Sequence, residues 1–109
     1  MKKPVEYEKV INRIQENEKM LDDALVSIKN LEDALISFKS NIDNIKLLDK
    51  YYGSKEWLSD KKNLEKGIIN NIKAGVLSED LIWNMLDDVN YLMSDMKNVC
   101  DSYGEKYEK

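Results

Sequence analysis

The stretch that decides the fold reads VINRIQENEKMLDDALVSIKNLEDALISFKSNIDNI (Val10–Ile45), and its apolar residues recur every seven positions. One core column holds Ile14, Leu21, Ile28, Leu35 and Ile42, and the other holds Val10, Asn17, Ala24, Leu31, Phe38 and Ile45. A sustained seven-residue repeat keeps its apolar edge facing a partner when helices wind around one another in a left-handed supercoil. The pattern predicts one long, coiled-coil-like helix over about residues 5–49.

The residues after this stretch predict a turn and a second helix. Gly53 can take the left-handed conformation that ends a helix, and Ser54 can cap the next one. We expect a second helix over about residues 54–74. Gly67 and the pair Asn70-Asn71 lower its helical propensity, so it is either kinked or divided in two.

A third helix has the clearest start signal in the sequence. Ser78 supplies a cap, and Glu79 and Asp80 supply the negative charge that favours the amino end of a helix. We expect this helix over about residues 78–103. The polar tail from Gly104 is expected to fray.

The second and third helices are too short to cover the first. Helices of about 20 and 25 residues span about 30 and 38 Å, whereas an unbroken first helix spans roughly 65 Å. The sequence therefore predicts an all-α, elongated three-helix bundle in a single domain (residues 1–109) that forms a homodimer through the uncovered heptads. The candidate seam residues are Val10, Ile14, Asn17, Leu21 and Ile28. A bend in the first helix, giving a four-helix bundle, is the structural alternative.

Asn17 is the one polar residue in the two core columns. A buried asparagine can pair with a polar group across a coiled-coil interface and so fix the register. The alternative interpretation is an asparagine at a frayed, solvated end of the seam.

Composition bounds the class of protein. The 109 residues include one proline and four glycines, 42% are apolar, and the net charge is −4. No run approaches the roughly 20 apolar residues of a membrane-spanning helix. The single cysteine cannot form an internal disulfide and suits a reducing compartment. We therefore expect a cytoplasmic protein with no membrane segment.

Two blocks of the sequence carry a family resemblance: YYGSKEWLSD (Tyr51–Asp60) and KAGVLSED (Lys73–Asp80). With the long preceding helix, they resemble an uncharacterised family of short helical proteins from Gram-positive bacteria, a domain of unknown function whose signature is YYGSxEW followed by GVLSED. Members have a leucine-proline step between the blocks, where this sequence reads GIINN (Gly67–Asn71). The resemblance implies a helical fold and no activity, because the family has no established catalytic or binding residues.

Residue types that carry catalysis are scarce. The sequence has no histidine, which removes the commonest general base and zinc ligand. Cys100 falls on the apolar stripe of the third helix, so we expect a buried thiol rather than a reactive one. Carboxylates on facing helices can hold magnesium in a nucleotide hydrolase, but they must then point into a dry pocket, whereas these lie mainly on polar faces. Those candidates are Glu16, Glu18, Asp22, Asp87 and Asp88. We expect no catalytic residue, metal or cofactor.

Four aromatic residues near the turns are candidates for partner binding. Such residues are enriched where binding energy concentrates. The alternative is that they lock a turn onto the ends of neighbouring helices. The residues are Tyr51, Tyr52, Trp57 and Trp83.

The third helix is acidic. Residues 76–109 carry three basic and eight acidic groups, and four aspartates fall near one another on the polar side of the helix. They are Asp80, Asp87, Asp88 and Asp95. The middle segment, residues 51–75, is mildly basic. On a net-acidic protein this is a weak nucleic-acid footprint, and we expect no direct binding of nucleic acid.

Three hypotheses for function follow. The first is a noncatalytic protein–protein interaction module of unknown partner, acting through the seam, the acidic helix or the aromatic turn. The second is an acidic inhibitor from a phage or mobile element that occupies the nucleic-acid channel of a host defence enzyme such as a CRISPR effector. The third is a magnesium-dependent nucleotide hydrolase, for which turnover of a nucleotide with magnesium or manganese is the test. Strong salt dependence of binding favours the inhibitor, and salt-insensitive binding favours the apolar seam.

Overall fold

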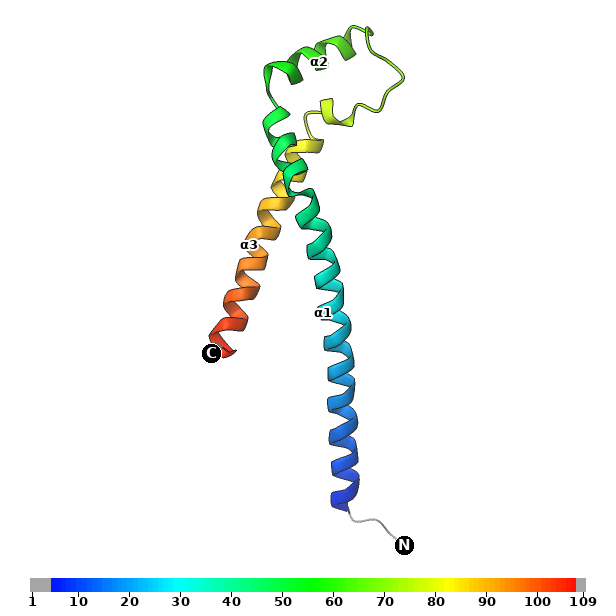
Figure 1. Cartoon of the computed structure of the whole chain (residues 1–109), viewed down its shortest axis with the longest axis vertical. Helices are drawn as coiled ribbons and strands as arrows, with labels where there is room; N and C mark the ends of the chain where they lie inside the picture. Colours follow the sequence, from blue (N-terminus) through cyan, green and yellow to red (C-terminus); the bar gives the residue numbers. More distant parts are fainter. Residues whose placement is uncertain (1–4, 108–109) are drawn as a thin grey trace. The chain divides into compact units, whose positions relative to one another are not determined.

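The computed structural model describes residues 5–107 and shows an all-α chain, which confirms the predicted fold class (Figure 1). In chain order, the elements are α1 (Val5–Tyr51), α2 (Lys55–Glu65), the short 3-10 helix η1 (Gly75–Leu77) and α3 (Leu81–Tyr107). No strand occurs within residues 5–107. The chain divides into two compact units, an amino-terminal unit up to Ile42 and a carboxy-terminal unit from Asp43. The single domain expected from the sequence stays a prediction.

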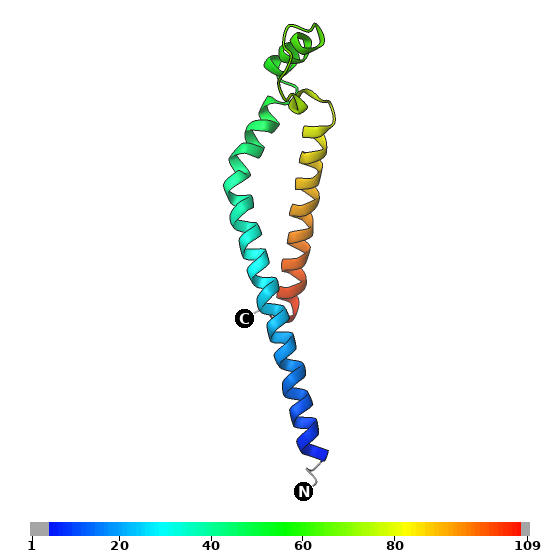
Figure 2. The same ribbon diagram turned by 90° about the vertical axis from the view of Figure 1, so that its right-hand side faces the viewer.

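Helix α1 runs for 47 residues without a break (Figure 2). Its sequence contains neither glycine nor proline, the two residues that most weaken a helix interior. At 1.5 Å per residue it is about 70 Å long. The alternative in which this segment bends back to give a four-helix bundle is therefore contradicted.

The described residues of the amino-terminal unit, 5–42, are all helical, and every side chain from Val5 to Ala34 is exposed. Its ion pairs, such as Lys19 with Asp23 at 2.8 Å and Lys29 with Asp33 at 3.0 Å, join residues one turn apart. Exposed pairs of this kind contribute little to stability, about 0.3–0.5 kcal/mol each. Among residues 5–42, no other segment covers the apolar residues of this helix.

The turn after α1 forms as the sequence predicts. Gly53 takes a positive φ of 76°, and Ser54 caps α2 by accepting a 3.1 Å hydrogen bond from the backbone N–H of Trp57. The Ser54 backbone is extended, with φ −70° and ψ 169°, as an N-cap requires. Two small residues, Gly53 and Ser54, therefore separate the end of α1 from the start of α2.

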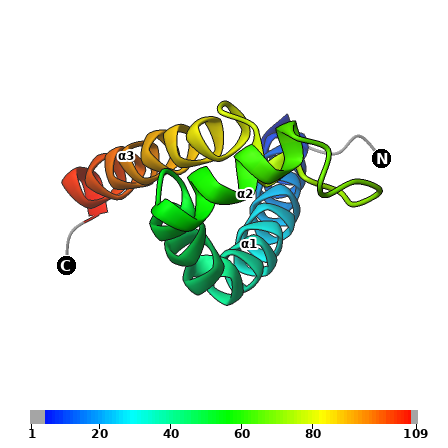
Figure 3. The same ribbon diagram turned by 90° about the horizontal axis from the view of Figure 1, so that it is seen from above.

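Helix α2 is shorter than the sequence predicts, because it ends at Glu65 rather than near residue 74. Gly67 takes a φ of +75° and closes the helix in a Schellman motif, in which the N–H of Gly67 bonds to the carbonyl of Leu64 and that of Ile68 to the carbonyl of Asn63. Asn71 also has a positive φ, 60°, so the helix does not restart there. The segment 66–74 loops away from the end of α2 before the chain returns to η1 (Figure 3).

Three apolar side chains are buried among the described residues: Trp57 of α2, Leu77 of η1 and Ile82 of α3. Helix η1 contacts both α2 and α3, so these three side chains form the core of the carboxy-terminal unit. No side chain among those described is fully buried. This is a small core for a chain of this length.

Helix α3 contributes to the core mainly along its first half. Ile82 is buried and Met85, Leu86 and Val89 are partly covered. Farther along, exposure returns at Leu92, Met93, Val99, Cys100 and Tyr103. The buried thiol predicted for Cys100 is therefore wrong. The remaining helical segments of this unit, at most 11 residues each, span less than about 17 Å and cannot cover a 27-residue helix of about 40 Å.

The carboxyl end of α3 also differs from the expectation. The helix continues through Gly104 to Tyr107, whereas fraying was predicted from Gly104. A single glycine lowers helix stability by only about 1 kcal/mol relative to alanine, which does not end a helix by itself. The last two residues of the predicted tail lie outside the described residues.

We predict that Trp57→Ala destabilises the carboxy-terminal unit by about 3–5 kcal/mol, because it empties the centre of a small core. Trp57→Phe keeps most of the apolar ring and removes the indole N–H, so we expect a smaller loss of about 1–2 kcal/mol. Urea unfolding followed by circular dichroism measures both values. The matched control is Trp83→Ala, since Trp83 is 57% exposed. Equal effects of Trp57→Ala and Trp83→Ala contradict the core assignment.

Candidate functional site

Two aromatic side chains tie the first turn to the start of α3. The rings of Tyr52 and Trp57 meet edge to face, with centroids 5.2 Å apart and planes at 68°. The Tyr52 hydroxyl donates to the backbone carbonyl of Glu79 at 2.7 Å. The Trp57 indole Nε1–H donates to the carbonyl of Val76 at 2.8 Å. The polar group of each side chain thus donates a hydrogen bond to a backbone carbonyl in the segment that leads into α3.

Lys61 and Glu79 contact each other beside the same two aromatic rings. The Lys61 Nζ lies 5.1 Å from the centroid of the Trp57 ring and 2.6 Å from Glu79 Oε1. The hydrogen bond between them raises the pKa of the Lys61 ammonium and lowers the pKa of the Glu79 carboxyl. We call Tyr52, Trp57, Lys61 and Glu79 the aromatic cluster. It joins two segments 18 or more residues apart in the sequence.

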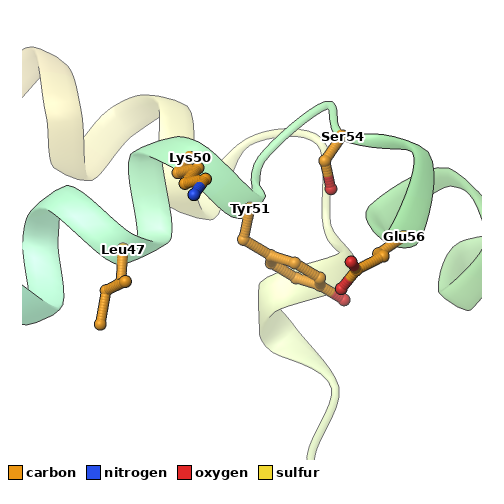
Figure 4. Close-up of a pocket in the computed structure, with 5 residues that line it drawn as sticks. All are labelled: Leu47, Lys50, Tyr51, Ser54 and Glu56. Atoms are coloured by element: carbon orange, nitrogen blue, oxygen red, sulfur yellow. The ribbon is translucent and has the colours of Figure 1, made fainter.

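Tyr51 faces a different set of groups. Its hydroxyl donates to Asp60 Oδ2 at 2.6 Å. This hydrogen bond, together with partial burial and the negative charges of Asp60 and Glu56, raises the pKa of Tyr51 to about 12. Figure 4 shows the Tyr51 ring extending toward Glu56 across a shallow hollow of about 270 Å³ that is also lined by Leu47, Lys50 and Ser54. The raised pKa keeps the phenol protonated, which is the opposite of what a nucleophile or base requires.

A second hollow, of about 310 Å³, lies beside η1 and is mainly apolar. Its lining residues are Leu48, Lys73, Gly75, Val76, Leu81, Ile82 and Met85. A Cβ atom at Gly75 would lie 3.0 Å from Leu81 Cδ1, so the absence of a side chain there lets the first turn of α3 approach η1 closely. Lys73 is the one ionisable residue in this lining, and no carboxylate or thiol lies beside it there.

The structure gives the predicted aromatic residues an internal role. Tyr51, Tyr52 and Trp57 all make contacts within the chain, and Trp57 is only 6% exposed. They lock the turn, which was the alternative interpretation of these residues. Trp83 is exposed on α3. Sequence reasoning missed Lys61 and Glu79 as part of the cluster, although Lys61 stands one turn after Trp57 and so on the same face of α2.

The four aspartates of the acidic group are all exposed on or just before α3. Ser78 caps the start of this helix as predicted, since its hydroxyl accepts from the N–H groups of Asp80 and Leu81 at 3.1 and 3.4 Å. The Asp80 carbonyl accepts the N–H of Asn84 at 2.8 Å. Asp87, Asp88 and Asp95 lie farther along α3, and their side chains are exposed like that of Asp80.

The suggested magnesium ligands lie on both units. Glu16, Glu18 and Asp22 are exposed on α1, and Asp87 and Asp88 are exposed on α3. Over the described part of the chain, no group of three or more His, Cys, Asp or Glu side chains is placed to hold a metal ion. None of the helices described combines the length and the apolar character needed to cross a membrane.

The seam residues form an exposed apolar edge on α1. Val10 is 38% exposed, Ile14 and Leu21 are each 51% exposed, and Ile28 is 61% exposed. Asn17 Nδ2 donates to the carbonyl of Arg13, one turn earlier, at 2.7 Å. The asparagine therefore uses one N–H within its own helix, and its second N–H and its side-chain oxygen are left for other partners.

Comparison with known proteins gives a family and no function. Residues 14–99 match the family described as Domain of unknown function (DUF4298), and the chain belongs to this family. Neither the curated proteins nor the solved structures contain a significant match. The matched residues include most of the seam and the whole aromatic cluster.

We predict that Tyr51→Phe destabilises the carboxy-terminal unit by on the order of 1 kcal/mol at pH 7 and flattens its pH dependence in alkali. A pKa raised from 10.0 to about 12 stabilises the folded state below pH 10, and this contribution is lost as the pH rises through 12. Urea unfolding at several pH values between 9 and 12 measures the effect. Tyr91→Phe, at a 70% exposed tyrosine, is the matched control. Parallel pH profiles of wild type and Tyr51→Phe contradict the assignment.

Proposed function

We propose that this member of the DUF4298 family is a noncatalytic helical module that binds another protein chain through the seam on α1. One observation carries the proposal: an unbroken helix presents apolar residues at heptad spacing, and its own unit leaves them exposed. Heptad spacing is the pattern by which one helix packs along another.

The energetics support an occupied seam. Most of the stability of a helix in a protein comes from packing its apolar face, and little comes from intrinsic propensity. Burying a Leu or Ile side chain fully contributes roughly 1.5–3 kcal/mol relative to leaving it exposed. Ile14, Leu21 and Ile28 all retain half or more of their exposure. A partner helix on this edge therefore supplies stabilisation that the amino-terminal unit lacks.

The rest of the chain supports a binding role for α1 over the aromatic turn. The aromatic cluster uses its hydroxyl, indole and ammonium groups inside the carboxy-terminal unit. We infer that the two blocks YYGSKEW and GVLSED are the signature of the family because they meet in this cluster.

We also infer a cytoplasmic location and a Gram-positive bacterial source. The lone, exposed thiol of Cys100 supports a reducing compartment.

The acidic face of α3 supports a second candidate function, inhibition of a nucleic-acid-binding host defence enzyme. Asp80, Asp87, Asp88 and Asp95 are exposed, and within residues 5–104 none of them enters an ion pair. A basic channel would bind such a face with strong salt dependence. Binding to a basic partner that survives high salt contradicts this second candidate.

The first proposal predicts that lysines in the seam abolish binding while lysines on the opposite face do not. Leu21→Lys with Ile28→Lys places two charges in the apolar edge. Asn12→Lys with Val26→Lys adds the same charge on the outer face, where Val26 is 61% exposed. Light scattering and recovery of copurifying chains from the source cell measure the difference, and we expect the wild type and the outer-face variant to carry a stoichiometric second chain. Loss of that chain in both variants, or a wild type that is monomeric and without a partner, contradicts the proposal.

A further inference from the structure

We propose that the occupant of the seam is a second copy of this chain, aligned parallel and in register. The inference rests on the proposed function and names its partner. It starts from the heptad, in which Ile14, Leu21 and Ile28 occupy position a, and Val10, Asn17, Ala24 and Leu31 occupy position d. The residues that flank such a core, at positions e and g, decide the choice and direction of the partner.

Asn17 selects the parallel, in-register arrangement. With both copies in register, position d faces position d, so Asn17 meets Asn17 of the second copy. Its side chain has already donated one hydrogen to the Arg13 carbonyl, which leaves a second N–H and the oxygen for the other asparagine. A shift by one heptad puts Asn17 opposite Val10 or Ala24, and an antiparallel arrangement puts it opposite the apolar a column. Both arrangements leave buried polar atoms without a partner, which is costly.

The charged flanking residues select the same arrangement. In a parallel pair, a residue at g faces the residue five positions later, at e, on the other chain. Arg13 is at g and Glu18 is at e, so the two copies form this ion pair twice. In an antiparallel pair g faces g and e faces e, so Arg13 cannot meet Glu18. Neither residue has an ion pair within the described part of its own chain.

The apolar flanking residues also favour the parallel, in-register arrangement. Met20 at g and Leu25 at e are five residues apart and are 58% and 55% exposed. In the parallel pair they cover each other beside the Leu21 and Ala24 layers, which widens the apolar contact. Among the g-to-e pairs from Glu6 to Lys39, none brings together two like charges. The edge is therefore self-complementary in charge and in apolar character.

Disulfide trapping tests the direction and the register. In a Cys100→Ser background, Val10→Cys and Leu31→Cys are made as separate variants and oxidised with glutathione. The two sites are 21 residues apart, about 32 Å along the helix. A disulfide requires Cα atoms within about 4.4–6.8 Å, so both variants form cross-linked dimers only if the helices are parallel and in register. Val26→Cys, on the outer face, is the control that should remain uncrosslinked.

A charge exchange provides an independent readout. Arg13→Glu and Glu18→Arg each create two like-charged contacts, so we expect each to weaken the dimer by on the order of tenfold. The double variant restores opposite charges, and we expect its dissociation constant to return close to that of the wild type. Analytical ultracentrifugation measures all four proteins. A double variant no tighter than either single variant overturns the pairing.

Failure of this inference is distinguishable from failure of the proposed function. A dimer that cross-links at one of the two sites, or at neither, overturns the parallel register and leaves a seam-dependent interaction in place. A wild type that is monomeric at all concentrations, and uncrosslinked at both sites, overturns the second copy as occupant. The comparison of seam and outer-face lysine variants then decides whether the seam binds a different chain.

Discussion

The structure depends on one constraint: a long helix with an apolar edge is not stabilised by its own backbone hydrogen bonds and must pack that edge against something. In the amino-terminal unit the edge consists of heptad-spaced residues that remain exposed, and the part of this unit that the structure describes is a single helix with no second segment to cover them. The ion pairs along this helix are exposed and local, so they cannot take the place of packing. The proposed interaction follows from this imbalance, and the proposed occupant follows from Asn17 and the residues that flank the apolar edge.

The carboxy-terminal unit meets the same demand by another route. Trp57, Leu77 and Ile82 give it a small core, and hydrogen bonds from Tyr52 and Trp57 to backbone carbonyls hold the turn against the start of α3. Buried aromatic residues contribute large apolar areas, and their polar atoms find partners when they are buried. The aromatic rings and their polar groups therefore stabilise the fold of this unit. The hydrogen bond from the Tyr51 hydroxyl to the Asp60 carboxylate raises the pKa of the phenol and holds it in the protonated form.

Sequence reasoning predicted local features well and long-range ones poorly. The seven-residue apolar repeat predicted a continuous helix, which α1 confirms. Gly53 and Ser54 predicted the turn because their conformational and capping preferences act over a few residues. The predicted end of the second helix near residue 74 was wrong, because Gly67 was expected to kink or divide the helix, whereas its left-handed conformation ends it after Glu65. Cys100 was placed in a core because stripe periodicity shows which face is apolar and cannot show whether a neighbour covers it. The contact of Lys61 with Glu79 joins distant segments and has no local signal.

Amide hydrogen exchange along α1, measured over a range of protein concentrations, tests the central claim most directly. If the seam is covered by another copy of the chain, the amides of residues 10–31 are protected at high concentration and lose protection on dilution, while those of α2 and the first half of α3 keep a constant protection. Protection of residues 10–31 that does not change with concentration, or its absence even in concentrated solution, would contradict a seam covered by a second copy of the chain.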